Sequence, residues 1–265
     1  MRTQASYKDA LTLTLSANIM FFEYTSKGDL IVFKKIIPIF TIALLPNIAL
    51  ANYDAEVSLS TVTSIDDSSK TIYSLNYSQV IGITEKFSTQ IDLYYNDLSN
   101  GCSCSYNGAM LHLMYDVNDN LTFGIHRGLS DEDGSDYIHQ GIEVKYTLGN
   151  FDLELSYSGE SSKGSSFESS EYWYNSSVIY NLNEKSSIGV QTYNYKELSW
   201  DSDTKYKFSY NHNFENNFTT KVTYIEDSGN QEIKLELIKK FGNGKTMSDK
   251  SWIGGYLSPF SIRAK

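Results

Sequence analysis

Apolar and polar side chains alternate with a period of two along most of the chain after residue 52. In run 151–160, Leu153 and Leu155 fall on one face, whereas Asp152 and Glu154 fall on the other. Successive side chains of a β-strand point to opposite faces of a sheet, so this period predicts strands. No long segment keeps a helical period, and we therefore predict an all-β fold.

The alternation predicts about twelve strands, each near the ~10 residues that a tilted membrane strand needs. The predicted strands are 53–64, 71–81, 87–99, 108–117, 121–130, 136–148, 151–160, 171–182, 186–198, 204–214, 218–227 and 231–241. The connections after the even-numbered strands are tight, at 82–86, 118–120, 149–150, 183–185 and 215–217. The intervening connections are mostly longer and richer in acids or serine, which is typical of an up-and-down membrane barrel.

The lengths of the turns predict which residues of neighbouring strands lie opposite each other. The turn at 118–120 places Val117 opposite Leu121, and Leu113 opposite Ile125. The other turns predict the pairs Leu148–Phe151, Val144–Leu155, Lys145–Glu154, Phe214–Phe218 and Tyr210–Val222. Every pair joins residues of the same face, and a slip of one residue would reverse this agreement.

Alternation alone does not separate a membrane barrel from a soluble β-sandwich, because both have one apolar face. Aromatic residues near the strand ends favour the membrane, where they form interfacial girdles. These residues are Phe87, Tyr95, Tyr146, Phe151, Tyr157, Tyr172, Phe214 and Phe218. The many charges on the polar face suit a wet lumen. We therefore predict a transmembrane antiparallel up-and-down β-barrel of about twelve strands, with a soluble exported β-sandwich binding protein as an alternative.

The segment before the first strand has the layout of a secretory signal peptide. Lys34 and Lys35 precede an apolar run at 36–45, and Ala49 and Ala51 form a small-residue cleavage pattern. We predict a signal peptide at 32–51 and a mature chain that starts at Asn52. Residues 1–31 lack this pattern, and we interpret them as an extension upstream of the true start codon.

Composition narrows the possible functions. The formal net charge of -10 argues against a nucleic-acid partner, because phosphate binding needs a basic surface. The chain holds 21 Tyr and only 3 Pro, which suits strands. Cys102 and Cys104 lie in one polar loop and imply no disulfide framework. Nothing in the sequence indicates a cofactor.

The last predicted strand gives the most specific resemblance. Ile233, Leu235 and Leu237 alternate towards a final Phe241. With the strands and turns above, residues 52–241 resemble the porin-like outer-membrane β-barrel superfamily. The resemblance implies that Phe241 is the signal for the barrel-assembly machinery, and that the protein lies in the outer membrane of a Gram-negative bacterium.

Two features depart from the pattern of that superfamily. Lys239 stands where an apolar or aromatic residue is expected, and residues 242–265 follow Phe241, where such chains usually stop. We interpret 242–265 as a periplasmic tail.

The polar face supplies the residues expected to line a pore. They are Asp54, Glu56, Asp92, Asp116, Glu143, Lys145, Asp152, Glu154, Lys205, Lys207, Lys221, Glu232, Lys234 and Glu236. These charges either form an electrostatic filter for small polar solutes or only pair across strands and hydrate the interior. Acids outnumber bases in this set, which predicts a weak preference for cations.

Aromatic residues also fall on the polar face, at Tyr94, Tyr137, Trp173, Tyr193 and Tyr195. They either fill space or offer flat surfaces to sugar rings.

Three histidines also fall on the polar face. The predicted pairing sets His112 opposite His126, with His139 at a similar height on the next strand. Three neutral imidazoles are able to bind a transition metal, or to act as a pH sensor. The simplest alternative is three hydrated lumenal side chains.

We predict a passive porin-like channel for small polar solutes. The alternatives are a non-conducting structural or adhesive surface barrel, or a barrel enzyme. We expect no enzyme, because no strand shows a Ser-His-acid arrangement and His212 falls on the lipid face.

The predicted outer loops are acidic, and the acids serve either solubility or a contact with the membrane surface. Through calcium or magnesium, they would bridge to anionic lipopolysaccharide among the outer-membrane lipids. These acids are Asp66, Asp67, Asp131, Glu132, Asp133, Glu168, Asp201, Asp203, Glu226 and Asp227.

Overall fold

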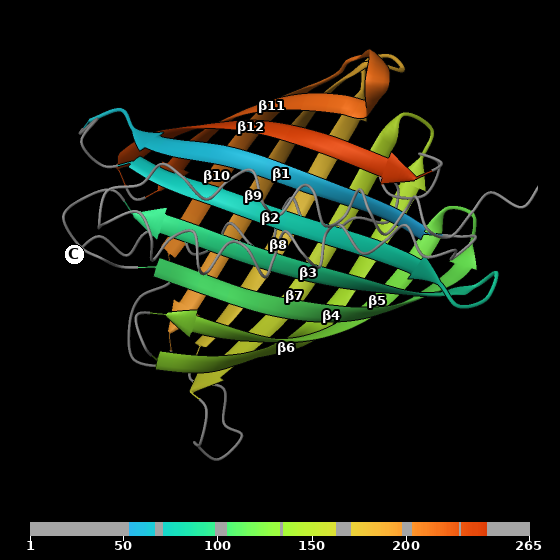
Figure 1. The fold of residues 1–265 in the computed structure, drawn as a ribbon, viewed down its shortest axis with the longest axis horizontal. Coiled ribbons are helices and arrows are strands. Elements are labelled where there is room, and N and C mark those ends of the chain that lie inside the picture. Colours follow the sequence, from blue (N-terminus) through green and yellow to red (C-terminus); the bar gives the residue numbers. More distant parts are fainter. Residues whose placement is uncertain are drawn as a thin grey trace, which may run out of the picture. The chain divides into compact units, whose positions relative to one another are not determined.

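The computed structural model describes residues 53–66, 71–98, 105–132, 135–162, 171–197, 203–227 and 229–242. They form a closed antiparallel barrel of twelve strands, in which each strand pairs with its neighbours in sequence (Figure 1). The strands are β1 (Tyr53–Ser64), β2 (Thr71–Gly82), β3 (Phe87–Leu98), β4 (Ser105–Asn118), β5 (Leu121–Glu132), β6 (Ser135–Leu148), β7 (Phe151–Ser162), β8 (Glu171–Asn181), β9 (Ser186–Glu197), β10 (Asp203–Asn213), β11 (Phe218–Asp227) and β12 (Asn230–Gly242).

The predicted strands are confirmed, and their bounds shift by only a few residues. The largest difference is at β4, which begins at Ser105 instead of residue 108. The first and last strands pair directly, with Ala55 opposite Phe241, and this pairing closes the sheet on itself. A single closed sheet excludes the two packed sheets of a β-sandwich.

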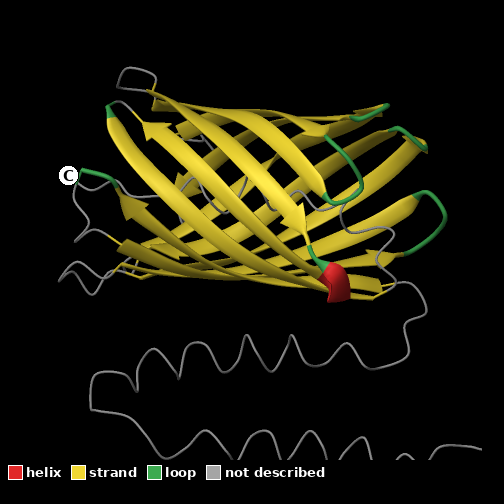
Figure 2. Ribbon diagram, turned by 90° about the horizontal axis from the view of Figure 1, so that it is seen from above, coloured by secondary structure: helices red, strands yellow, loops and turns green. Residues whose placement is uncertain are grey.

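Tight turns connect the strands at one end of the barrel (Figure 2). At one of them, the Asn183 side-chain oxygen accepts hydrogen bonds from the backbone N–H groups of Lys185 and Ser186. At another, the short 3-10 turn η2 (Glu215–Asn217) holds Asn216 and Asn217 at φ angles of 69° and 61°. Asn tolerates this left-handed region better than most residues, so the two asparagines suit the reversal.

The predicted pairing of the strands is largely confirmed. The confirmed pairs are Leu113–Ile125, Leu148–Phe151, Val144–Leu155, Lys145–Glu154, Tyr210–Val222 and His112–His126. Phe214 also donates its backbone N–H to the carbonyl of Phe218, as expected for that turn. The predicted pairing of Val117 with Leu121 is wrong. The register shifts between Asp116 and Asn118, so that Asn118 stands opposite Leu121. This bulge absorbs one extra residue of β4 next to the turn.

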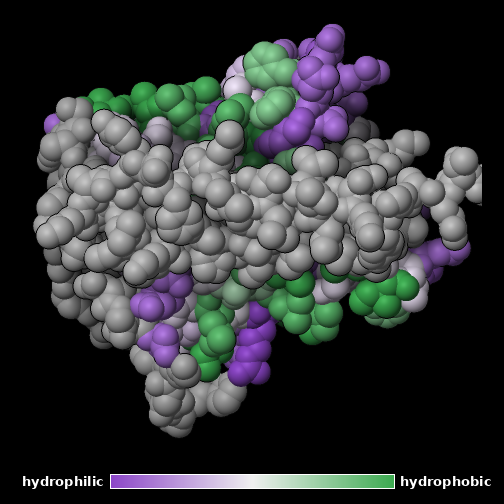
Figure 3. Space-filling view, in the orientation of Figure 1, coloured by the Kyte–Doolittle hydropathy of each residue, from purple (hydrophilic) through white to green (hydrophobic). Residues whose placement is uncertain are grey.

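The outer wall is apolar and the inner wall is polar. On β6, Ile142 is 58% exposed, whereas its neighbour Glu143 is 1% exposed. The same contrast separates Leu113, at 48%, from His112, at 0%. Figure 3 shows hydrophobic side chains on the described parts of the outer surface. Apolar residues outside and buried charges inside are the reverse of a water-soluble protein, and they are expected where hydrocarbon surrounds the barrel.

The inner face is not uniformly polar, although alternation alone suggested it. Val62, Ile72 and Ile225 are buried together on the inward-facing positions of β1, β2 and β11. Val80 and Met114 form a second buried apolar contact. Apolar side chains therefore occupy part of the interior.

The contacts of Lys239 account for a charged residue at a position where the pattern predicts an apolar one. Its ammonium group lies 4.2 Å from the centroid of the Phe218 ring and donates a hydrogen bond to the backbone carbonyl of Asn216. Phe218 stands opposite Lys239 in the β11/β12 ladder. The long side chain thus runs along the outer wall to the turn, where the charge finds polar partners.

Several predictions fall outside the described residues. They concern the segment 1–31, the signal peptide at 32–51 with Ala49 and Ala51, and the tail from residue 243 onward. Cys102 and Cys104 also lie outside them.

Among the described residues, no helix is long and apolar enough to cross a membrane.

Candidate functional site

The predicted pore-lining residues all occupy inward-facing positions, and their side chains are buried or half-buried. Several of them are compensated by a neighbour. The Lys205 Nζ lies 2.6 Å from an Asp227 carboxylate oxygen, and the Lys234 Nζ lies 3.3 Å from Glu236 Oε1. These pairs are part of a charged inner wall over β10, β11 and β12.

Hydrogen bonds satisfy acids elsewhere on the wall. The Thr122 hydroxyl donates to Asp116 at 2.7 Å. The Thr147 hydroxyl and the Asn181 amide donate to Asp152 at 2.8 and 3.0 Å. These neutral donors hold the two carboxylates in place and leave their negative charge on the inner wall.

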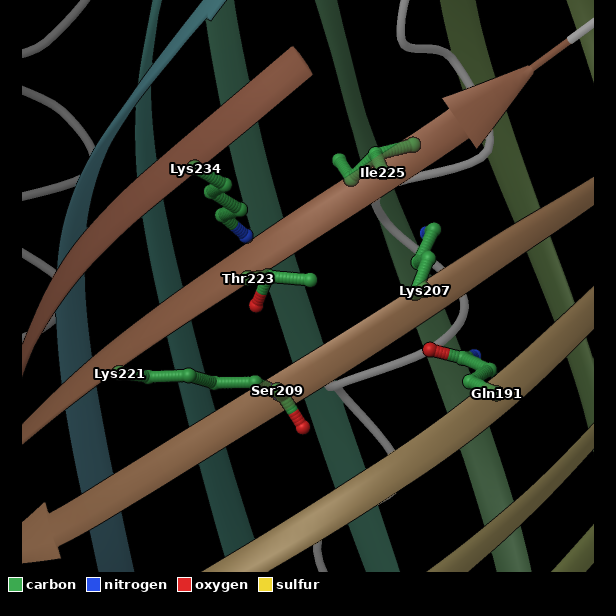
Figure 4. A pocket seen from close by; sticks show the side chains of 7 residues that line it. All are labelled: Gln191, Lys207, Ser209, Lys221, Thr223, Ile225 and Lys234. Atoms are coloured by element: carbon green, nitrogen blue, oxygen red, sulfur yellow. The ribbon is translucent and has the colours of Figure 1, made fainter. Parts of the chain in front are cut away.

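A lysine-lined pocket lies on the inner face of β9 to β12 (Figure 4). It is a small hollow that is partly open to the lumen, and its lining is Gln191, Lys207, Ser209, Lys221, Thr223, Ile225 and Lys234. Lys207 is buried, at 4% exposure, and no described residue accepts a hydrogen bond from its ammonium group. The pocket therefore presents positive charge that its own wall does not fully compensate.

A buried polar cluster lies on β3 to β7. The His112 Nε2 lies 2.8 Å from Asp92 Oδ2, and its Nδ1 lies 2.9 Å from Glu143 Oε1. The His126 Nδ1 lies 3.6 Å from Glu143 Oε2, and its Nε2 lies 2.9 Å from the Ser158 hydroxyl. Each imidazole thus directs its Nδ1 at the carboxylate of Glu143. Its Nε2 faces a residue on a flanking strand, which is Asp92 for His112 and Ser158 for His126.

Glycines make room for this cluster. Gly124 stands opposite Glu143, and Gly141 stands opposite His126. A Cβ on Gly124 would lie 2.4 Å from Glu143 Oε1, and a Cβ on Gly141 would lie 2.6 Å from His126 Cε1. Glu143 on β6 therefore reaches across β5 to His112 on β4, over a position that carries no side chain.

The predicted group of three histidines is only partly assembled. The ligand atoms that lie within 4.8 Å of one another belong to His112, His126 and Glu143. His139 has different neighbours, because its Nε2 lies 2.7 Å from the Ser130 hydroxyl and its Nδ1 lies 3.4 Å from Glu160. Glu143 therefore takes the place that sequence reasoning gave to His139.

The predicted lumenal aromatic residues are mostly packed away. Tyr94, Trp173 and Tyr193 are 2%, 3% and 5% exposed. The Tyr94 ring lies over Gly108, where a Cβ would come within 2.5 Å, and Trp173 lies against the His139 ring. These three rings offer little face to a sugar. Tyr137 is half-buried, and the side chain of Tyr195 lies outside those described.

The sequence predicted no Ser-His-acid arrangement, but the described residues contain two. Ser158, His126 and Glu143 stand in that order, and so do Ser130, His139 and Glu160. A hydrolase also needs donors for an oxyanion and space for a substrate. Ser158 is 1% exposed and stands in the middle of a strand paired on both sides, which supplies neither.

His212 lies on the outer wall, as predicted. Its ring packs edge-on against Phe214, and its Nδ1 lies 3.0 Å from the Ser186 hydroxyl. These contacts are those of an interfacial side chain.

Known proteins share the fold of this chain. A KdgM porin aligns with a TM-score of 0.55 and 11% identity, over 71% of this chain and 99% of the porin. A NanC porin aligns with a TM-score of 0.54 and 10% identity, over 68% and 98% of the two chains. An outer membrane channel from Pseudomonas putida F1 aligns with a TM-score of 0.53 and 10% identity, over 73% and 97%. The barrel therefore has the fold of outer-membrane porins.

Sequence comparison adds no closer relative. No protein-family model matches the chain, and no curated protein matches it.

Proposed function

We propose that this protein is a channel in the outer membrane of a Gram-negative bacterium, through which small polar solutes diffuse passively. The observation that carries the proposal is the inverted barrel, apolar outside and charged inside, in a single closed sheet. Such a wall is stable in hydrocarbon and hydrates its interior. The fold shared with the KdgM and NanC porins supports the same class of function.

The lysine-lined pocket deepens the proposal by favouring anionic solutes. Lys207, Lys221 and Lys234 line one pocket, whereas Asp92 and Glu143 flank His112 on other strands. Lysines thus line the space that a solute would occupy, although one of them, Lys234, is paired with Glu236. We therefore propose a preference for anions in place of the weak cation preference expected from the count of charges.

A structural neighbour is consistent with this solute class. The KdgM porin has been solved in complex with disordered oligogalacturonate. At 12% identity the likeness extends only to the fold, so the argument for anions rests on the three lysines of this chain.

The second candidate is a non-conducting structural barrel. The buried apolar cluster of Val62, Ile72 and Ile225 favours it, because apolar side chains on an inner wall dewet a narrow passage. In either case the outer wall faces membrane lipids and lipopolysaccharide, and Phe241, 45% exposed on β12, would be the residue read by the assembly machinery.

Single-channel recording tests the proposal. The protein, purified in detergent, is inserted into planar bilayers, and its current is measured in symmetric salt and in a salt gradient. We expect discrete steps and a reversal potential on the anion-selective side. Stable silence over all salts and voltages, from a barrel shown to be folded, would favour the structural role instead.

A further inference from the structure

The buried cluster on β4, β5 and β6 has the arrangement of a metal site. We propose that His112, His126 and Glu143 bind one divalent transition-metal ion such as Zn²⁺. Their ligand atoms lie within 4.8 Å of one another, and all three side chains are buried. Two imidazoles and one carboxylate are a donor set that zinc uses, with a fourth position left for water.

The orientation of both imidazoles favours a metal. His112 and His126 both direct Nδ1 at Glu143, and their Nε2 atoms lie 2.8 Å from Asp92 and 2.9 Å from Ser158. Histidines that bind metals almost always donate their other ring N–H to a carboxylate, carbonyl or water, and this bond fixes the ring and the tautomer. Asp92 provides the usual acceptor for His112, and the Ser158 hydroxyl provides a related one for His126.

Asp92, the partner of the His112 Nε2, is itself held in place by hydrogen bonds. The Gln90 amide donates to both oxygens of Asp92, at 2.9 and 3.0 Å. Gln90 is 0% exposed and Asp92 is 1% exposed, so the support is part of the buried wall. The ring of His112 is therefore pre-oriented before any ion arrives.

The spacing between Glu143 and His126 suits an ion. Glu143 Oε2 accepts no hydrogen bond from the described residues, and the His126 Nδ1 lies 3.6 Å away. Two ligands of a tetrahedral zinc ion stand about 3.3–3.5 Å apart, since each is ~2.0–2.2 Å from the metal. An ion would therefore bridge a gap that is too long for a hydrogen bond.

Charge and space agree with this assignment. Metal binding requires both imidazoles to be neutral, and a divalent ion would then balance the two negative charges of Asp92 and Glu143 inside the buried site. Gly124 and Gly141 keep the surroundings of Glu143 and His126 clear. A single ion needs less room than the substrate that a hydrolase built on Ser158, His126 and Glu143 would have to admit. Imidazole nitrogens favour a transition metal over Ca²⁺ or Mg²⁺, which take oxygen ligands.

Calorimetry on the folded barrel tests the site. The untagged protein in detergent is stripped with EDTA and titrated with Zn²⁺. We expect uptake of one ion, and binding weaker by about tenfold or more in Glu143→Gln, in His126→Ala and in Asp92→Asn. His139→Ala is the matched control, and its affinity should equal that of the unchanged protein. Absence of saturable uptake by the unchanged protein, or equal affinity in all variants, would overturn the proposal.

Cobalt gives a second readout that does not require every variant to fold. Co²⁺ bound to the unchanged protein should show the visible absorption of a low-symmetry site with nitrogen and oxygen ligands, and Zn²⁺ should remove it. Excess Ca²⁺ should leave the absorption unchanged. A spectrum identical to that of hexaaqua Co²⁺ would contradict the site. Both measurements use the folded barrel in detergent, so their outcome is independent of whether the channel conducts.

Discussion

His126 stands directly opposite Gly141 in the β5/β6 ladder, and a Cβ on Gly141 would lie 2.6 Å from the imidazole Cε1. It would also lie 2.1 Å from the backbone carbonyl oxygen of Tyr157, which is fixed by the next strand. Gly141→Ala should therefore destabilise the barrel, by about 1–3 kcal/mol of unfolding free energy, as overpacking does. Denaturant unfolding in lipid vesicles, followed by tryptophan fluorescence, measures the change.

Gly124 provides the matched control for that substitution. The three atoms nearest to a Cβ there all belong to the side chain of Glu143, with its Oε1 at 2.4 Å. A side chain moves more easily than a strand, so Gly124→Ala should cost less stability than Gly141→Ala. Equal losses in the two variants would show that the backbone contact at Tyr157 is not the cause.

A charged substitution on the lipid-facing wall should cost more unfolding free energy the deeper it lies in the membrane. Ile142 lies near the middle of β6 and is 58% exposed, whereas Leu148 ends the strand on the same face and is 57% exposed. Ile142→Arg should lower the unfolding free energy by about 2–4 kcal/mol, and Leu148→Arg by about 0–1 kcal/mol, because the interface hydrates the guanidinium. Reversible urea unfolding in vesicles measures both. Equal costs would indicate that hydrocarbon does not cover this face.

The fold could be predicted because a barrel repeats two local rules. Period-two alternation assigns each residue to a face, and turn length sets the pairing, as with Lys145 and Glu154. The bulge between Asp116 and Asn118 could not be predicted, because an extra residue beside a turn leaves the faces of the earlier pairs unchanged.

The candidate site was only half predictable, because its third member contacts His112 across an intervening strand. Sequence pairing gave His112 opposite His126, but Glu143 reaches His112 from two strands away, across Gly124. Glycines at inward-facing positions, such as Gly124 and Gly141, were the available signal. The selectivity of the lumen stays a prediction, since a count of acids does not reveal which of them have partners.

Lys239 should stabilise the pairing of β12 with β11 by a modest amount. Its ammonium group stacks on Phe218 and donates to Asn216 in the turn. Lys239→Leu should lower the unfolding free energy by about 0.5–1 kcal/mol through loss of the cation–π contact, although it restores the apolar pattern. Lys239→Arg keeps the charge over the ring and is the control. Greater stability of the Leu variant would show that the pattern outweighs the contact.

Lys207 should set the selectivity of the channel more strongly than any exposed lysine. It lines the pocket, is 4% exposed and has no hydrogen-bond acceptor among the described residues, so its charge, when it is protonated, would act on whatever enters. Lys207→Glu should move the reversal potential in a salt gradient towards cation selectivity, and Lys207→Gln should move it part of the way. Lys185 lies in an exposed turn, with its side chain 62% exposed, so Lys185→Glu should leave the potential nearly unchanged because water and salt screen it. If both glutamate variants shifted the potential equally, the net charge of the protein, rather than the lysine-lined pocket, would control which ions pass.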